Sequence, residues 1–222
     1  MSAPLFVMSW SGGKDSCLAL WRTLQSGARP LALLSMLDET GERSRSHGIS
    51  PEVLQAQVEA LAIPLVTGRA TWGEYEAVFI AQLQALQAQG AEMAVFGDID
   101  LQPHRDWEEK VCAAAGLQAV LPLWQEQRLS LVREFVDAGF VATIVVIRSD
   151  LMAADYLGKV LDHALIARMQ AEGIDPCGEG GEFHTLVTAG PLFARALPLR
   201  EKARHQHDKY SMLEFELSDS IL

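Results

Sequence analysis

The stretch Leu5-Phe6-Val7-Met8, followed two residues later by Ser11-Gly12-Gly13-Lys14-Asp15-Ser16, decides how the rest of this chain is interpreted. Four consecutive apolar residues predict a buried strand. The residues after the glycine pair predict a helix that Asp15 or Ser16 caps. A helix N-terminus presents unpaired N–H groups and a partial positive charge, glycines let the backbone approach an anion, and Lys14 adds a full charge. The segment is therefore typical of a phosphate-binding site.

The spacing of the glycines excludes two commoner nucleotide motifs. The P-loop needs G-x-x-x-x-G-K-[ST], whereas Gly12 and Gly13 are adjacent, and the dinucleotide fingerprint G-x-G-x-x-G is absent. The hexapeptide instead resembles the SGG-x-DS loop of the PP-loop ATP pyrophosphatases. In that family the loop grips the pyrophosphate end of ATP and leaves the α-phosphate open to attack. A capped Gly-Gly turn without a ligand is the alternative.

The composition describes a compact globular chain of 222 residues, of which 49% are hydrophobic and 21% charged. Its net charge of −11 argues against a nucleic-acid partner, because nucleic-acid binders usually show a basic footprint. No apolar run approaches the ~20 residues that span a bilayer, so no membrane partner is expected. The N-terminus does not resemble a signal peptide, and three widely spaced cysteines fit a reducing compartment. A cytoplasmic location is expected.

Apolar strands alternate with helix-period segments over roughly the first 120 residues, which predicts a parallel sheet with helices on both faces. The expected fold class is therefore α/β, with a smaller α+β domain at the C-terminal end. We place the boundary at Pro122-Leu123-Trp124, which divides the chain into domains 1–122 and 123–222. No linker and no internal repeat separates the two parts.

Seven strands and six helices are expected. The strands cover residues 5–8, 31–37, 64–66, 93–96, 119–121, 140–147 and 183–187. The helices follow the glycine pair, begin at Ser50-Pro51-Glu52, include residues 75–86, and cover 106–115, 129–138 and 161–172. The last 20 or so residues carry no clear pattern.

Ligands of open α/β sheets bind outside the carboxyl ends of the strands, where Gly97-Asp98-Ile99-Asp100 is expected beside the glycine-lysine loop. Mg²⁺ prefers oxygen ligands and often bridges a carboxylate and a phosphate. Asp15 is the nearest candidate for that carboxylate, followed by Asp98 and Asp100. A turn-capping role for Asp98 is the alternative.

His47 lies in the polar loop 38–47 with Arg43 and Arg45, at the carboxyl end of the second expected strand. Such a cluster is suited to phosphates or to a carboxylate substrate. A solvated loop is the alternative and, on the residues alone, the better supported one.

A second chemically rich segment covers residues 175–185, with the sequence Asp-Pro-Cys-Gly-Glu-Gly-Gly-Glu-Phe-His-Thr. Its glycines indicate unusual backbone conformations, and its carboxylates, imidazole and hydroxyl supply acid–base groups. If Phe183 begins a strand, Phe183 and Thr185 share one face and Glu182 and His184 share the other. Phe183 is then expected to pack inward, and Glu182 and His184 to face the cleft. An acidic hairpin without function is the alternative.

Together with Phe96-Gly97-Asp98-Ile99, Pro122-Leu123-Trp124 and Gly190-Pro191-Leu192-Phe193, these two segments resemble the diphthine–ammonia ligase family. The resemblance extends in order from the first strand to about Phe193. It implies a HUP-type, Rossmann-like adenine-nucleotide domain and a smaller domain that closes over an acid substrate. In this family ATP adenylates a carboxylate, and ammonia then displaces AMP to form an amide.

The resemblance also implies site residues. The ATP-binding set is Ser9, Ser11, Gly12, Gly13, Lys14, Asp15, Ser16, Met36 and Gly97, with Asp15 as the metal ligand. The catalytic set is Lys14, Asp98, Glu182 and His184. The substrate-binding set is His47, Glu179, Gly180, Gly181, Glu182 and Thr185. ATP, Mg²⁺, ammonium and a carboxylate on a protein or a metabolite are the expected partners, and the sequence leaves a homodimer open.

One residue departs from the family pattern. Members that amidate diphthine on elongation factor 2 carry Glu-Gly-Gly-Glu-Phe-Glu-Thr, whereas His184 replaces the last glutamate in this chain. The histidine form resembles a bacterial-type subgroup with a suggested role on a small metabolite, linked to corrinoid salvage. The substitution exchanges a fixed anion for a group that titrates near neutral pH, which bears on the acid substrate and not on the ATP chemistry.

Three other functions remain as alternatives. The same ATP chemistry on a small metabolite fits the residues as well as amidation of a protein does. A tRNA-modifying or thiolating PP-loop enzyme ranks lower, because the chain has no C-x-x-C and an acidic surface. A module that binds ATP or AMP without turnover is the third alternative.

Overall fold

The computed structural model describes residues 3–45 and 47–218, which form two compact units. The first unit consists of residues up to Ser11, Asp15–Ser46 and Ala62–Gln125. The second consists of Gly12–Lys14, His47–Leu61 and Glu126 onward. The division at residue 122 stays a prediction. The second compact unit also includes the segments Gly12–Lys14 and His47–Leu61 from the N-terminal half of the chain.

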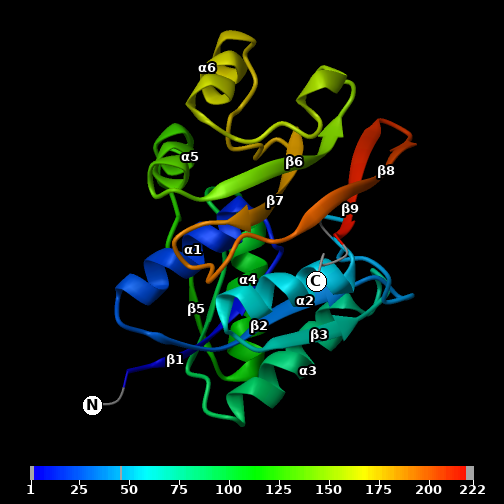
Figure 1. Ribbon diagram of the computed structural model, residues 1–222. Helices are drawn as coiled ribbons and strands as arrows, with labels where there is room; N and C mark the ends of the chain where they lie inside the picture. Colours follow the sequence, from blue (N-terminus) through cyan, green and yellow to red (C-terminus); the bar gives the residue numbers. More distant parts are fainter. Residues whose placement is uncertain (1–2, 46, 219–222) are drawn as a thin grey trace. The chain divides into compact units, whose positions relative to one another are not determined.

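The first unit is built on a parallel sheet with the strand order β3-β2-β1-β4-β5 (Figure 1). Its strands are β1 (Leu5–Ser9), β2 (Arg29–Leu37), β3 (Leu65–Arg69), β4 (Met93–Val95) and β5 (Gln118–Val120). β1 is central, with Val7 paired to Ala32 on one side and to Ala94 on the other. A central first strand brings the loop after β1 to the middle of the carboxyl edge of the sheet.

Both faces of this sheet are buried. Val7, Leu34 and Phe96 pack on one face with Phe79 and Val111, which belong to α3 (Tyr75–Gln87) and α4 (Gln102–Ala115). Strand residues that alternate with these, such as Phe6 and Met8, are fully buried on the opposite face. The near-continuous apolar strands of the sequence are explained by this two-sided burial.

The helix after the glycine pair, α1, covers Lys14–Gln25, so it begins two residues earlier than a cap at Asp15 requires and three earlier than a cap at Ser16 requires. Asp15 lies in the first turn instead, where a carboxylate still complements the positive end of the helix. The predicted start of α2 (Pro51–Leu61) is confirmed, and the amide of Val53 donates to the hydroxyl of Ser50 at 3.4 Å.

The second unit contains an antiparallel sheet with the order β7-β6-β9-β8. Its strands are β6 (Val141–Arg148), β7 (Phe183–Ala189), β8 (Leu199–His207) and β9 (Tyr210–Leu217). Its helices are α2, α5 (Arg128–Asp137), α6 (His163–Ala171) and the short 3₁₀ helix Ala154–Tyr156. β7 is an edge strand of this sheet, which leaves one side of its backbone to pair outside the sheet.

The expected α/β fold and all seven expected strands are confirmed, with bounds that shift by a few residues. The hairpin of β8 and β9, orange to red in Figure 1, was not predicted. Within the described residues, no helix is both long enough and apolar enough to cross a membrane. Cys17, Cys112 and Cys177 are buried free thiols.

Candidate active site

The predicted site residues fall into two groups, one in each unit. Ser9, Ser11, Asp15, Ser16, Met36, Gly97 and Asp98 belong to the first unit. Gly12–Lys14, His47, Glu179–Glu182, His184 and Thr185 belong to the second. Each group is described by itself.

The two glycines of the loop are required by neighbouring side chains of the second unit. Gly12 has a φ of +80°, and a Cβ there would lie 2.7 Å from Oε1 of Gln57. A Cβ on Gly13 would overlap the ring of His47. The glycines thus allow α2 and the residues before it to approach the loop backbone closely.

Thr185 and Val187 of β7 hold the loop at two points. The amide of Lys14 donates to Oγ1 of Thr185 at 3.0 Å, and the amide of Val187 donates to the carbonyl oxygen of Gly12 at 3.0 Å. The loop therefore continues the free edge of β7. Thr185 is 2% exposed, so its buried hydroxyl serves the loop backbone.

The side chain of Lys14 is almost fully buried, and its Nζ lies 5.6 Å from the ring centroid of Phe183. Phe183 and Thr185 both pack inward at the start of β7, as predicted. A lysine charge over an aromatic face at this distance is a cation–π contact, which stabilises the charged form without neutralising it.

His47 is a neutral residue beside this loop. Its Nδ1 lies 2.8 Å from the carbonyl oxygen of Thr185, and its ring centroid lies 4.7 Å from that of His184. Burial, and to a smaller extent the charge of Lys14, lowers the pKa of His47 to about 4 although the bond to Thr185 opposes the shift. His47 is thus uncharged at neutral pH and its Nδ1–H donates to Thr185.

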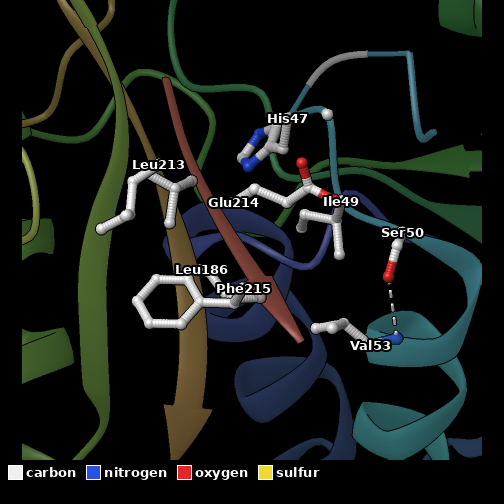
Figure 2. A pocket seen from close by; sticks show the side chains of 10 residues that line it. His47, Ile49, Ser50, Val53, Leu186, Leu213, Glu214 and Phe215 are labelled. Atoms are coloured by element: carbon white, nitrogen blue, oxygen red, sulfur yellow. Dashed lines mark hydrogen bonds between the residues drawn. The ribbon is translucent and has the colours of Figure 1, made fainter. Parts of the chain in front are cut away.

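Beyond His47, a shallow pocket of the second unit is lined by the start of α2 and by β9 (Figure 2). Its walls are mainly apolar, with Ile49, Val53 and Phe215 among them. The Glu214 carboxylate, also on the lining, accepts bonds from Lys202 at 2.7 Å and His205 at 2.9 Å. The pocket suits an apolar group, because this carboxylate already has two cationic or polar partners.

The loop before β7 is organised by Asp175. Its carboxylate forms an ion pair with Arg128 at 2.6 Å and accepts from the amides of Cys177 at 3.0 Å and Glu179 at 3.2 Å. This places Glu179, Gly180 and Gly181 in a tight turn, where Gly181 has a φ of +77°.

Glu182 is folded back over this turn. A Cβ on Gly180 would lie 2.6 Å from Oε1 of Glu182, so a side chain at this position would displace the carboxylate. Oε2 of Glu182 is buried and has no hydrogen-bond partner among the described residues. A buried carboxylate oxygen without a donor is costly, and a cationic donor such as ammonium would satisfy it.

In the first unit, Gly97 lies against the first turn of α1. A Cβ there would lie 2.8 Å from both the carbonyl carbon of Asp15 and the amide nitrogen of Ser16. Ser11 and Ser16 share a hydroxyl–hydroxyl bond of 3.0 Å at the same turn. The sequence predicted that Gly97 lets the backbone pass close to a ligand, which stays a prediction; the structure shows that Gly97 makes room for the backbone of α1.

Asp98 follows Gly97 and is held by two residues of α4. Its Oδ1 lies 2.7 Å from Nδ1 of His104, and it shares a hydrogen bond with Glu108. Burial raises the pKa of Glu108 to about 11, and the bond and charge of Asp98 add to the shift. Burial also opposes ionisation of Asp98, but the bonds from His104 and Glu108 prevail and lower its pKa. Glu108 is therefore a neutral acid that donates to an ionised Asp98.

Met36 is buried in β2, where its Sδ lies 2.7 Å from the position of a Cβ on Gly68, and Ser9 ends β1. Within the described residues, no group of three or more histidine, cysteine, aspartate or glutamate side chains is arranged to hold a metal ion. Mg²⁺ that arrives with a nucleotide needs only one or two carboxylates, since phosphates and water supply its other ligands. Asp15, in the first turn of α1, fits that smaller requirement.

Three residues around these sites were missed from the sequence: Gln57, His104 and Glu108. Gln57 interrupts the apolar stripe of α2 and is fully buried, which is the one local signal it offers. His104 and Glu108 are four residues apart and so share one face of α4. Their position shortly after Asp98 in the sequence is the one local signal that they offer.

Comparison with known proteins identifies the family of the chain. The diphthamide synthase N-terminal domain matches residues 5–119, and the diphthamide synthase C-terminal domain matches residues 127–221. The human protein named diphthine–ammonia ligase is 26% identical, over 95% of this chain and 91% of its own length. The Schizosaccharomyces pombe protein of that name is also 26% identical, over 89% of this chain but 36% of its own length.

A solved structure is also similar, the predicted subunit of a tRNA methyltransferase from Methanocaldococcus jannaschii. It is 15% identical, with a TM-score of 0.46 over 85% of this chain and 98% of its own. The two matched domains together account for nearly the whole sequence. The chain belongs to the diphthamide synthase family, whose relatives include the diphthine–ammonia ligases.

Proposed function

We propose that this protein is an ATP-dependent ligase that activates a carboxylate as its adenylate and converts it into an amide with ammonia. The observation that carries the proposal is the loop Gly12-Gly13-Lys14, which meets the N-terminus of α1 in a chain matched by both diphthamide synthase domains. An anion at a helix N-terminus gains the partial charge of the helix and its unpaired N–H groups.

In the first step, a carboxylate oxygen of the substrate attacks the α-phosphorus of ATP, and pyrophosphate leaves with the electrons of the bridging bond. Ser11, Gly12, Gly13, Asp15 and Ser16 hold the β- and γ-phosphates with Mg²⁺ in this proposal. Lys14 balances the charge that grows on the departing pyrophosphate. The neutrality of His47 fits this role, because the two groups do not compete for the same anion.

In the second step, the nitrogen of ammonia attacks the acyl carbon, and AMP leaves with the electron pair of the acyl–oxygen bond. Ammonium needs a site that removes a proton before attack. The buried Oε2 of Glu182, which has no donor among the described residues, supports this carboxylate as the holder of ammonium. Glu179 and His184 are the other candidates for that proton.

Asp98 stays ionised and is fixed by two hydrogen bonds, which suits a group that orients a cation or the ribose of a nucleotide. We assign it a catalytic or ligand-positioning role in the first unit. His47 and the turn Glu179–Glu182 are assigned to the acid substrate, with the apolar pocket beside His47 as a wall for its carbon skeleton.

The acid itself is the open part of the proposal. The relatives are named for diphthine, which makes a protein side chain the first candidate. His184 makes a small metabolite the second, since a titratable imidazole replaces the glutamate of the family pattern at this position. A cytoplasmic setting remains an expectation from the sequence, as does a homodimer.

The test uses α-labelled ATP with Mg²⁺ and ammonium, to which the protein fraction or the small-molecule fraction of a host extract is added separately. AMP that depends on the protein fraction supports a macromolecular acid, and AMP that depends on the small molecules supports a metabolite. Production of ADP would overturn the α–β cleavage. Clear ATP binding without turnover under either condition would favour a nucleotide-sensing module.

A further inference from the structure

Gln57 is a polar residue in the middle of the apolar stripe of α2. It is 0% exposed, whereas its neighbours on the same stripe, Leu54, Val58 and Leu61, are all hydrophobic. Placing a primary amide in such surroundings costs free energy unless its hydrogen bonds are made. The hydrogen-bond partners of Gln57 therefore indicate the role of its side chain.

The amide nitrogen of Gln57 donates to two backbone carbonyl groups. Its Nε2 lies 3.0 Å from the carbonyl oxygen of Gly12 and 2.8 Å from that of Val187. The Gly12 oxygen also accepts from the amide of Val187 at 3.0 Å. One carbonyl of the loop thus receives two hydrogen bonds, from a helix and from a strand that are far apart in the sequence.

Fixing the Gly12 carbonyl fixes the next amide as well. The peptide bond from Gly12 to Gly13 is trans, so its C=O and N–H point in opposite directions. With the oxygen held toward Gln57 and β7, the N–H of Gly13 points to the other side of the loop. The amide of Lys14 is held separately, by Thr185.

Orientation of this peptide matters for an anion. If the plane turned over, the partial negative charge of the Gly12 oxygen would face the phosphate in place of the N–H of Gly13. Gly12 is free to turn, because a glycine with φ of +80° has no side chain to restrict it. A bond from a buried side chain on a regular helix removes that freedom before ligand binds, which reduces the entropy cost of binding.

We propose that Gln57 is a positioning residue of the ATP site, which holds the Gly12–Gly13 peptide with its N–H toward the phosphates. The inference rests on the proposed use of ATP by this loop. It adds a residue of α2 to the proposed phosphate contact of the loop Gly12–Lys14. In this proposal Gln57 makes no contact with the ligand and acts on the loop through the backbone of Gly12.

The experiment compares Gln57→Met, which keeps the length of the side chain and removes the hydrogen bonds to both carbonyl groups, with Gln55→Met on the same helix. Gln55 is exposed and bonds to Glu59, at 3.1 Å, so its replacement leaves the loop intact. Binding of ATP with Mg²⁺ and of adenosine is measured by titration calorimetry below the unfolding temperature of each variant. Adenosine has no phosphate and serves as the internal control.

We expect Gln57→Met to weaken ATP binding about tenfold, which corresponds to the loss of one or two neutral hydrogen bonds. Adenosine binding should be unchanged, and Gln55→Met should match the wild type for both ligands. Equal weakening of ATP and adenosine would show a merely structural role and overturn the inference, as would unchanged ATP binding.

If Gln57→Met does not fold, Gln57→Asn takes its place, because the shorter amide cannot reach both carbonyl oxygens and stays polar. The same selective loss of ATP binding is expected. A wild-type protein that binds no ATP would overturn the proposed function and this inference with it. A wild-type protein that binds ATP, with variants that bind it equally well, would overturn the inference alone.

Discussion

The carboxyl end of β4 in the first unit and the edge of β7 in the second hold their chemical groups in different ways. At β4, Asp98 remains a carboxylate because neutral Glu108 and His104 donate to it. At β7, the loop Gly12–Lys14 is held by an amide, a hydroxyl and backbone groups, and the adjacent His47 is uncharged. One region preserves a negative charge, and the other surrounds the loop that we assign to phosphate with neutral groups and a lysine.

The difference shows how burial can prepare opposite sites in one chain. Burial makes both Glu108 and His47 neutral, but a neutral acid is a donor that stabilises a carboxylate, whereas a neutral imidazole adds no competing charge. Four substitutions test this difference between the two regions, and they are given in order of decreasing expected effect.

Replacing Lys14 with alanine removes the cation at the β7 edge whose charge we assign to catalysis. We expect AMP formation to fall at least ~100-fold, since loss of one preorganised charge-stabilising group costs about 3 kcal/mol in the transition state. Rates are measured with α-labelled ATP and the extract fraction that supports turnover. Lys159→Ala, at an exposed lysine, is the control. Unchanged turnover in Lys14→Ala would remove the catalytic role from the loop.

Gly97→Ala tests the contact of the β4 region with α1. The new methyl group would lie 2.8 Å from backbone atoms of Asp15 and Ser16. Because these are backbone atoms, rotation of a side chain cannot relieve the overlap. Overpacking of this kind costs about 1–3 kcal/mol of unfolding free energy, measured by urea denaturation. Gly73→Ala is the matched control, because nothing lies within 4 Å of a Cβ there. Equal stability of the two variants would contradict the close approach.

Glu108→Gln separates the donor role of Glu108 from its charge. The folded protein keeps a proton on Glu108, whereas the unfolded chain releases it above a pKa near 4.5. The free energy of unfolding of the wild type therefore falls as the pH rises from about 4.5 toward about 11. Glutamine does not titrate and still donates to Asp98. We expect the Tm of the variant to gain on the wild type by ~2 °C or more between pH 5 and pH 9.

The exposed neighbour provides the control for this pH series. Glu109→Gln removes a carboxylate from the solvent face of the same helix and should follow the wild-type curve. A constant difference in Tm between Glu108→Gln and the wild type at every pH would show that Glu108 is ionised in the folded protein, and Asp98 would then lack its neutral donor.

His47→Gln gives the smallest expected effect. Because the pKa of His47 is lowered from 6.5 to about 4 on folding, the unfolded chain binds an extra proton between these values. The stability that neutral His47 contributes to the folded protein is fully present above pH 6.5 and is lost as the pH falls toward 4. The variant should therefore lose less Tm than the wild type between pH 7 and pH 5, as measured by thermal denaturation. His207→Gln, at an exposed histidine, should behave like the wild type.

The sequence predicted the β4 end and the loop better than it predicted what holds them. Leu5–Ser9 and the Gly-Gly-Lys loop are local patterns, so strand, loop and helix could be placed within two or three residues. Gln57 could not, because its role depends on carbonyl groups 45 and 130 residues away along the chain. A single polar residue on an apolar stripe does not say which backbone it meets.

The hairpin of β8 and β9 was missed for a different reason. β8 is mostly exposed and charged, and it shows little of the alternation that marks a half-buried strand. Cross-strand pairs support it instead, such as Lys202 with Glu214 at 2.7 Å and Arg200 with Glu216 at 2.8 Å. The turn at Asp208, with a φ of 49°, gives only a weak local signal.

Hydrogen exchange read by mass spectrometry, with and without ATP and Mg²⁺, tests most directly whether the loop after β1 binds the nucleotide. We expect slower exchange in the peptide that covers residues 10–18 when ATP is added, and no such change when adenosine replaces ATP. ATP that binds, as shown by calorimetry, while exchange in residues 10–18 stays the same would contradict the assignment of this loop as the phosphate site.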